Sequence, residues 1–559
     1  MSAMITPLAD PIPLDGCFVP LEGWTAQAQM LLSPELQELL ARLHRELEPE
    51  RRELLLAREE RQERWNRGEC PGFLADDELP EARREWRIAP LPSDLMRRRV
   101  GIAGPLCDRR AVFDLFSRNA DGVVADVALL DLEDSMKPSW SNVLQGLVNL
   151  VGAADGTLSC AGSAAAPFAP ELQLDPSDRP LLVVRVRGLH LTESNVLVDG
   201  AAICAGLFDL VCAAYWSART LLDHGRTPSY DLPKCEHHLE ARWWNRLLER
   251  IEDELDLPPR TIKATALIET LPAAFQMEEI LYQLRDHAAG LSVGRWDRIA
   301  SDIKVLSRHP DRVLADRWTI DLDRPWLRNH ALRLISVCHR HGAFALGGMP
   351  AGSTPGGADE CRERLRAEHD LECALGHDGG WVAHPDDLGA ALAAFPRDHQ
   401  LEIVPPTPDR PELLPEDCGP RTLFGLRGNV RIAIAYLRGW NDGIGCVVWD
   451  DRREDLSSLE VARAQTWQWL HHRTVLEGGE RVTLELVRGI FAEEQARIER
   501  ELGERGADHH EIEAYRKARL DAETIFTERR LRPFLSMASD PAGLAGDLRR
   551  ARLRGDALA

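Results

Sequence analysis

The chain has 559 residues, of which 44% are hydrophobic and 28% are charged, and its formal net charge at pH 7 is −22. This length predicts two or three domains, and this composition is typical of a globular enzyme. The strong negative charge argues against nucleic-acid binding, and no apolar run approaches the roughly 18–20 residues that cross a bilayer. We therefore expect neither a nucleic-acid nor a membrane partner.

The N-terminal region, residues 1–98, is expected to be irregular at first and then helical. Its first residues include acids and prolines where a secretory signal would be basic and apolar, so we expect a cytoplasmic protein. From Ser33 to Arg67, leucine, glutamate and arginine recur at helical spacing, which predicts a solvated pair of amphipathic helices.

Residues 99–395 have the pattern of a parallel α/β domain. Short apolar runs alternate with helical stretches, and the runs include VADVALLDL, LLVVRV, ATALI, AGLSVG, AFALGG and WVAHP. So many β-α repeats over roughly 300 residues predict a (β/α)8 barrel. A doubly wound sheet is the alternative, but no G-x-G-x-x-G fingerprint follows the first strand.

The rest of the chain predicts a linker and a second helical domain. Residues 396–420 are rich in proline and aspartate, which indicates the linker, and residues 421–559 are again helical in character. The twelve cysteines form no C-x-x-C pair, so neither a zinc site nor a disulfide framework is predicted. The adjacent histidines at 237–238, 471–472 and 509–510 are expected to be surface residues without metal-ligand geometry.

Charged residues stand where several predicted strands end. Arg185 ends LLVV, Glu269 follows ATALI, and AGLSV continues through Gly294 to Asp297. Active sites of such barrels form at the C-terminal ends of the strands, and two carboxylates beside an arginine suit a hard divalent cation with an anionic substrate. Glu269 and Asp297 are therefore candidate Mg²⁺ ligands, and Arg185 is a candidate to hold a developing negative oxygen. Structural ion pairs are the alternative for all three.

Several longer sequence blocks point to one enzyme family. They are RVRGLH, TIKATALIETLPAAFQMEEILYQLRDHAAGLSVGRWD, GAFALGGM, GHDGGWVAHP, DLEDSMKPSWSNVLQGLVNL, LPK at 232–234 and GNVRIAIAYLRGWNDGIGC. From Trp86 to His472 the chain resembles malate synthase of the shorter, A type. The resemblance implies a TIM barrel with an N-terminal helical clasp and a C-terminal helical domain that plugs the barrel mouth. It also implies Mg²⁺-dependent condensation of acetyl-CoA with glyoxylate, followed by hydrolysis to malate and CoA.

The resemblance also implies roles for individual residues. Glu269 and Asp297 become the Mg²⁺ ligands, and Arg185 becomes the catalytic arginine. Counting back from WQWLHH assigns the general base, which deprotonates the acetyl group, to Asp455 of the C-terminal domain.

Further residues are carried over as substrate-binding or water-holding groups. Glu133 and Asp134 resemble carboxylates that hold metal-bound water. Trp381 resembles a tryptophan that walls the glyoxylate pocket, and Gly294 and Trp296 are substrate-binding candidates of the GRWD block.

Two residues after Asp297 depart from the family pattern. Arg298 and Ala300 stand where the family has aromatic residues, which predicts a wider or differently charged pocket. This departure motivates one alternative function: a related enzyme that condenses a larger 2-oxo acid or acyl-CoA, or a malyl-CoA lyase or thioesterase.

The segment around Asp455 also differs from the family. It motivates a second alternative, a CoA-ester-binding paralogue without turnover. Ser457 and Glu460 predict a capping box at the start of the following helix. Asp455 would then have only a structural role at the start of that helix. Asp450 and Asp451 are then the reserve candidates for the base.

Overall fold

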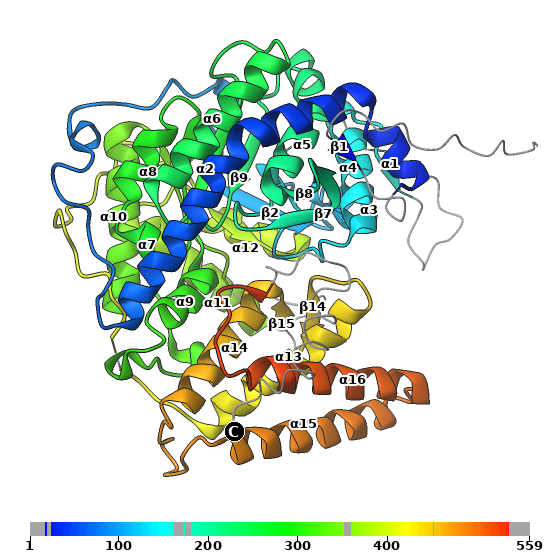
Figure 1. Cartoon of the computed structure of the whole chain (residues 1–559), viewed down its shortest axis with the longest axis vertical. Helices are drawn as coiled ribbons and strands as arrows, with labels where there is room; N and C mark the ends of the chain where they lie inside the picture. The colour runs from blue at the N-terminus through cyan, green and yellow to red at the C-terminus, as the bar shows by residue number, and fades with distance from the viewer. Residues whose placement is uncertain are drawn as a thin grey trace, which may run out of the picture.

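The computed structural model describes residues 17–18, 24–160, 172–173, 180–350, 359–416, 418–450 and 452–535. Most of the predicted irregular start of the chain lies outside the described residues. Figure 1 shows a barrel surrounded by helices, with the C-terminal helices α13 to α16 gathered at one end of it. No helix among the described residues is long and apolar enough to span a membrane.

Eight parallel strands form the barrel, which confirms the predicted (β/α)8 architecture. They are β2 (Val100–Pro105), β3 (Val127–Asp131), β6 (Leu181–Arg185), β9 (Ser229–Leu232), β10 (Lys263–Ile268), β11 (Ala288–Val293), β12 (Phe344–Leu346) and β13 (Gly380–Val382). Neighbouring strands pair in this order, and β13 pairs with β2. A parallel bridge between Leu346 and Gly379 joins β12 to β13 and closes the ring.

Helices follow the strands and cover the outside of the barrel. The longer ones are α3 (Arg109–Leu115), α4 (Trp140–Asp155), α5 (Ala205–Asp223), α6 (His238–Glu254), α8 (Met277–Leu284), α9 (Arg295–Val305), α10 (Pro325–His341), α11 (Asp359–Leu375) and α12 (Leu388–Ala394). The short helix α7 (Leu271–Ala274) precedes α8. An antiparallel sheet of β1 (Cys17–Phe18), β7 (Thr192–Val198) and β8 (Ala201–Cys204) lies outside the ring.

Side-chain alternation along β3 and β6 determines what fills the barrel. Successive strand residues point to opposite faces, so every second residue turns inward. Val127, Leu129, Leu181 and Val183 belong to the inner cluster, whereas Ala128, Leu130, Leu182 and Val184 join the outer core beneath the helices. Asp131 and Arg185 continue the inward series at the C-terminal ends and stand opposite each other in register. The apolar interior therefore gives way to charged side chains at this end.

The N-terminal region contains one long helix instead of the predicted pair. After the short helix α1 (Ala26–Leu31), helix α2 runs without a break over Pro34–Asn66 and contains Pro49. The side chain of Ser33 accepts a hydrogen bond from the Leu36 backbone and caps it. Most of its leucines are buried against the barrel helices, and this packing keeps the helix continuous through the proline, which removes one N–H donor. In Figure 1, α2 runs diagonally across the barrel.

The C-terminal region begins after a stretch without described helices or strands between Ala394 and Leu423. It contains α13 (Leu423–Asn441), the hairpin of β14 (Val447–Trp449) and β15 (Arg452–Glu454), α14 (Leu456–His471), α15 (Leu484–Glu504) and α16 (His509–Phe526). Helix α14 is buried against α9 and the chain that follows it. There Gln465 donates to the Ala315 carbonyl at 2.6 Å, and Gln468 donates to the Arg312 carbonyl at 3.0 Å.

Candidate active site

An arginine–aspartate pair lies at the barrel mouth. The Nε and Nη2 atoms of Arg185 donate to the two carboxylate oxygens of Asp131 at 2.7 and 2.6 Å. This bidentate contact fixes the plane of the guanidinium, because both groups are planar and match in spacing. The Nη1 atom of Arg185 lies 3.2 Å from Asp134 and 3.8 Å from Glu133. Arg185 is therefore held in one orientation with further N–H donors remaining.

Lys234, which follows β9, brings four carboxylates together. Its Nζ atom lies 2.9 Å from Asp297, 3.1 Å from Glu133 and Asp134, and 3.4 Å from Glu269. The backbone of Lys234 has a positive φ of 56°, and its N–H donates to Glu269 at 2.7 Å. Glu269, directly after β10, and Asp297, after β11, therefore both lie close to the Lys234 ammonium.

This carboxylate cluster carries more negative than positive charge. Its members are Asp131, Glu133, Asp134, Glu269 and Asp297, and the only cations that the structure shows within 4 Å of them at this mouth are Arg185 and Lys234. Burial, together with repulsion from Asp134, raises the pKa of Glu133 and of Asp297. A divalent cation with a preference for oxygen ligands would offset this excess, so the donor set fits Mg²⁺.

Gly294 lies directly against Glu269. It precedes helix α9, whose first turn contains Asp297. A Cβ atom at position 294 would lie 2.5 Å from Cβ and 2.6 Å from Oε2 of Glu269, closer than atoms tolerate. Glycine at this position therefore sets the place of the Glu269 carboxylate.

Replacing Gly294 by Ala should displace the Glu269 carboxylate. It should lower kcat/KM of the expected condensation by at least about tenfold, because small misplacements of reacting groups reduce the reaction rate strongly. Steady-state kinetics on the Gly294→Ala variant tests this, with Gly389→Ala as the control. Gly389 lies in α12 with open space around its Cα, so that variant should keep wild-type kinetics. An unchanged kcat/KM in Gly294→Ala would show that Glu269 adjusts freely.

Asp455 caps helix α14 and also faces the barrel. Its Oδ1 accepts from the Ser457 hydroxyl at 2.6 Å and from the Ser458 backbone at 3.2 Å. In the described part of the chain, Oδ2 has no hydrogen-bond partner. The predicted capping box at Ser457 is wrong, because the N-cap is Asp455 and Glu460 instead accepts from Arg463. Capping therefore uses only one of the two carboxylate oxygens.

The environment of Asp455 raises its pKa to about 6, because the carboxyl is buried and Asp134 repels its charge. The backbone N–H of Leu456 donates to the Asp134 carbonyl at 3.2 Å, which attaches the start of α14 to the barrel mouth. The reserve candidate Asp450 pairs with Arg431 at 2.7 Å and does not line the cavity described next. Asp451 lies outside the described residues.

A cavity of about 450 Å³ joins the barrel mouth to the C-terminal region. Asp131, Arg185, Trp296 and Asp455 all line it. Its wall also carries a set of arginines: Arg110, Arg118, Arg317, Arg452 and Arg453. Asp114, Asp386 and Glu454 line the same wall, and Arg110 and Arg317 pair with Asp114 and Glu454. The six arginines of the lining outnumber its five carboxylates by one, which gives an anionic ligand a locally less negative place on a chain whose net charge is −22.

Trp381 and Arg298 do not line this cavity as far as the described residues show. The indole of Trp381 packs on Gly101 inside the barrel and donates from Nε1 to the Ser292 hydroxyl at 3.3 Å. Arg298 is buried on the other side of α9, where it bonds to Asp302, His330 and the Leu413 carbonyl. The substitutions after Asp297 therefore do not give this cavity the different charge that we expected.

Sequence reasoning missed two groups that the structure brings into view. Lys234 belongs to the LPK block and directly follows a strand. Its position at a strand end was therefore the feature of the sequence that could have identified it as a site residue. The expectation for the histidines at 237–238 is wrong, because these residues and Glu78 place potential ligand atoms within 4.8 Å of one another. Glu78 is distant in sequence, so no local pattern indicated this group.

Comparisons with known proteins match most of the chain. The family models described as malate synthase N-terminal domain, malate synthase TIM barrel domain and malate synthase C-terminal match residues 26–79, 181–405 and 420–539. The chain is 40% identical to malate synthase A of Escherichia coli (strain K12) over 493 residues, which cover 86% of this chain and 90% of that protein.

A second relative matches over a longer stretch. The chain is 39% identical to malate synthase of Myxococcus xanthus (strain DK1622) over 538 residues, which cover 94% of this chain and 96% of that protein. Among solved structures, the citrate lyase beta subunit of M. tuberculosis in complex with oxaloacetate and magnesium is 19% identical to this chain. The match covers 54% of this chain and 100% of that protein, and its TM-score of 0.34 is too low to support a conclusion. On the family models and both close relatives, the chain belongs to the malate synthase family.

Proposed function

We propose that this chain condenses acetyl-CoA with glyoxylate and hydrolyses the malyl-CoA product to malate and CoA. The observation that carries the proposal is the meeting of Asp455 and Arg185 in one cavity, although they come from different domains. Relatives with about 40% identity over most of the chain are named malate synthases, which supports the same assignment.

Asp455 is the proposed general base. A thioester methyl group is a weak acid, so its deprotonation needs a carboxylate close to the methyl carbon and stabilisation of the enolate oxygen that forms. The unpaired Oδ2 of Asp455 takes the proton, and its raised pKa makes it a stronger base than an ordinary carboxylate.

Arg185 is the proposed partner of the enolate oxygen. Asp131 fixes its guanidinium in advance, so no reorientation is needed while the negative charge develops. The same arrangement stabilises the oxygen when thioester hydrolysis releases CoA.

Mg²⁺ is the proposed cofactor, with Glu269 and Asp297 as its ligands. Glu133 and Asp134, which share the Lys234 ammonium with them, would hold the water ligands of the ion. When bound, the ion polarises the aldehyde of glyoxylate and orients its carboxylate. Gly294 and Trp296, at the start of α9, border the glyoxylate site, and Trp381 supports it from within the barrel.

Acetyl-CoA is the proposed second substrate, and the arginines of the cavity wall suit its phosphate groups. Arg317 and Arg452 both lie over the indole of Trp318, with their guanidinium carbons 3.8 and 4.1 Å from its ring centroid. Arginine binds phosphate through paired N–H donors, so this wall is the candidate path for the CoA chain.

Release of CoA tests the proposed reaction. Purified protein with Mg²⁺, acetyl-CoA and glyoxylate should release one thiol for each malate formed, measured with a thiol reagent and by chromatography. Glyoxylate should be preferred to pyruvate, and acetyl-CoA to longer acyl-CoAs. A preference for the larger partners would favour the related condensing enzyme, and a lack of thiol release would favour the CoA-ester-binding paralogue.

A further inference from the structure

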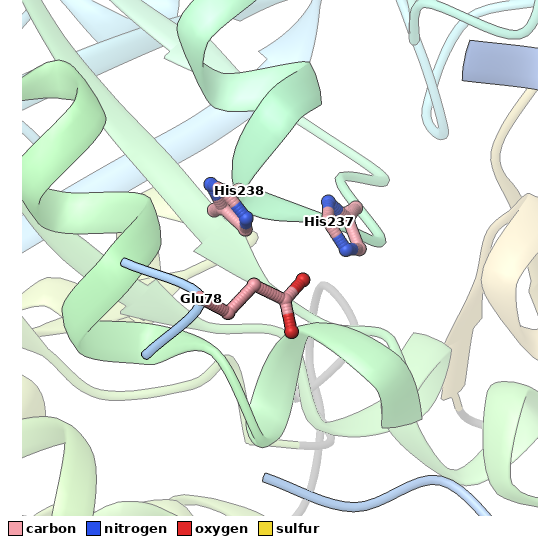
Figure 2. Close-up of side chains that lie close together, drawn as sticks. All are labelled: Glu78, His237 and His238. Carbon is pink, nitrogen blue, oxygen red and sulfur yellow. The ribbon is translucent and has the colours of Figure 1, made fainter. Parts of the chain in front are cut away.

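Three potential metal ligands meet outside the carboxylate cluster. Glu78, His237 and His238 each bring a ligand atom within 4.8 Å of the other two, and Figure 2 shows the two rings standing beside the Glu78 carboxylate. The centroids of the two rings are 4.5 Å apart, with a tilt of 33°. A divalent ion with ligand bonds of about 2.0–2.2 Å needs only a modest approach of these atoms.

Local structure holds the two imidazoles in place. His237 is the N-cap of helix α6, and its Nδ1 accepts from the Leu239 backbone at 3.3 Å. The Nδ1 of His238 lies 3.2 Å from the side-chain nitrogen of Gln283. Among the described residues, Nε2 of each ring has no hydrogen-bond partner. Each ring is therefore oriented through one nitrogen and can offer the other.

Protonation does not block the two imidazoles as ligands, although burial and nearby arginines disfavour positive charge here. Burial lowers the pKa of His237 to about 3 and that of His238 to about 4, so both rings are neutral near pH 7. Glu78 is exposed, which gives an ion access from solvent. The nearby Arg58 and Arg61 lie 2.7 and 3.7 Å from Glu240, which offsets their charge.

We propose that Glu78, His237 and His238 form a second metal site, for a borderline divalent ion such as Zn²⁺. Two imidazoles and one carboxylate match the ligand preference of Zn²⁺, whereas Mg²⁺ prefers oxygen alone. The site joins the N-terminal segment, which contains Glu78, to the connection between β9 and α6. Lys234 lies three residues before His237 on that connection, so the ion ties the segment to the chain that holds the carboxylate cluster.

Binding of Zn²⁺ to the full chain in excess Mg²⁺ tests this proposal. Calorimetry should show one site per chain, and Zn²⁺ should raise the melting temperature, because an ion that binds only the folded state stabilises it. Glu78→Gln, His237→Asn and His238→Gln should each weaken binding by at least about tenfold. Asparagine also caps helices, so His237→Asn keeps the start of α6.

Glu81→Gln is the matched control, because Glu81 is exposed on the same segment and should leave Zn²⁺ binding unchanged. Co²⁺ identifies the ligands: a tetrahedral or five-coordinate visible spectrum without thiolate charge transfer supports the site, and thiolate bands would assign the ion to cysteines and overturn it. Binding weaker than roughly 0.1 mM, or equal binding in all variants, would also overturn it. Glu78 is exposed, so its variant folds and keeps the comparison valid.

Discussion

Replacing Asp455 by Asn is expected to lower kcat by roughly 10²–10⁴-fold while leaving the fold at least as stable as that of the wild type. The amide cannot take the methyl proton, but asparagine caps helices as well as aspartate does, so α14 keeps its start. Steady-state kinetics and thermal melting of the same preparation give both quantities. The wild type should lose activity below a pH near 6, where Asp455 becomes protonated.

The stability difference of this variant should depend on pH in a defined direction. The carboxyl has a pKa near 6 in the fold against 3.8 as its ordinary value, so its ionisation destabilises the folded state. As the pH rises from 4 to 6, the wild type therefore loses up to ~3 kcal/mol of stability relative to the Asn variant. The two proteins should melt alike near pH 4, diverge between pH 4 and 6, and differ by a constant amount above pH 6.

Asp450→Asn is the matched control, since Asp450 pairs with Arg431 and lies five residues upstream. It should keep turnover and its pH profile. Substantial turnover in Asp455→Asn, or loss of turnover in Asp450→Asn alone, would move the role of base to the reserve candidate.

Replacing Glu269 by Gln is expected to raise the Mg²⁺ concentration needed for half-maximal activity by at least about tenfold and to lower kcat/KM by a larger factor. Glutamine keeps the size of the side chain but removes one of the negative charges that gather around Lys234. A hard cation depends on charged oxygen ligands, so the affinity should fall before the geometry changes. Calorimetric titration with Mg²⁺ and activity at varied Mg²⁺ measure the two effects.

Asp455→Asn serves as the comparison for this experiment, because it should be equally impaired in turnover but bind Mg²⁺ as the wild type does. Equal Mg²⁺ affinity in Glu269→Gln and Asp455→Asn would mean that Glu269 acts as a structural partner of Lys234 and not as a ligand.

The barrel and the position of its charged mouth were predictable because both follow from short-range patterns. Alternation along β3 and β6 sends Asp131 and Arg185 inward, and the rule that strand ends meet at one edge brings Glu269 and Asp297 to the same place. The continuity of α2 was not predictable, since it depends on packing against the barrel helices across Pro49.

The limits of sequence reasoning are clearest where distant segments meet. The cap of α14 lies at Asp455 because the chain leaves β15 there, which the motif at Ser457 does not show. Arg298 was placed beside the metal by sequence distance, but helical geometry turns it to the opposite side of α9. The group of Glu78 with His237 and His238 arises from tertiary folding alone.

The glutamines of α14 have a consequence for how this enzyme can diverge. Gln465 and Gln468 recognise carbonyl groups of the main chain at 312–315, which every amino acid supplies. Val313 and Leu314 of that stretch are buried in apolar clusters, so packing restricts them to apolar residues, whereas the two hydrogen bonds to α14 do not depend on which residues stand there. Exchange between apolar residues at 313–314, with loss of stability on replacement of either glutamine, is the pattern of variation that such main-chain recognition allows.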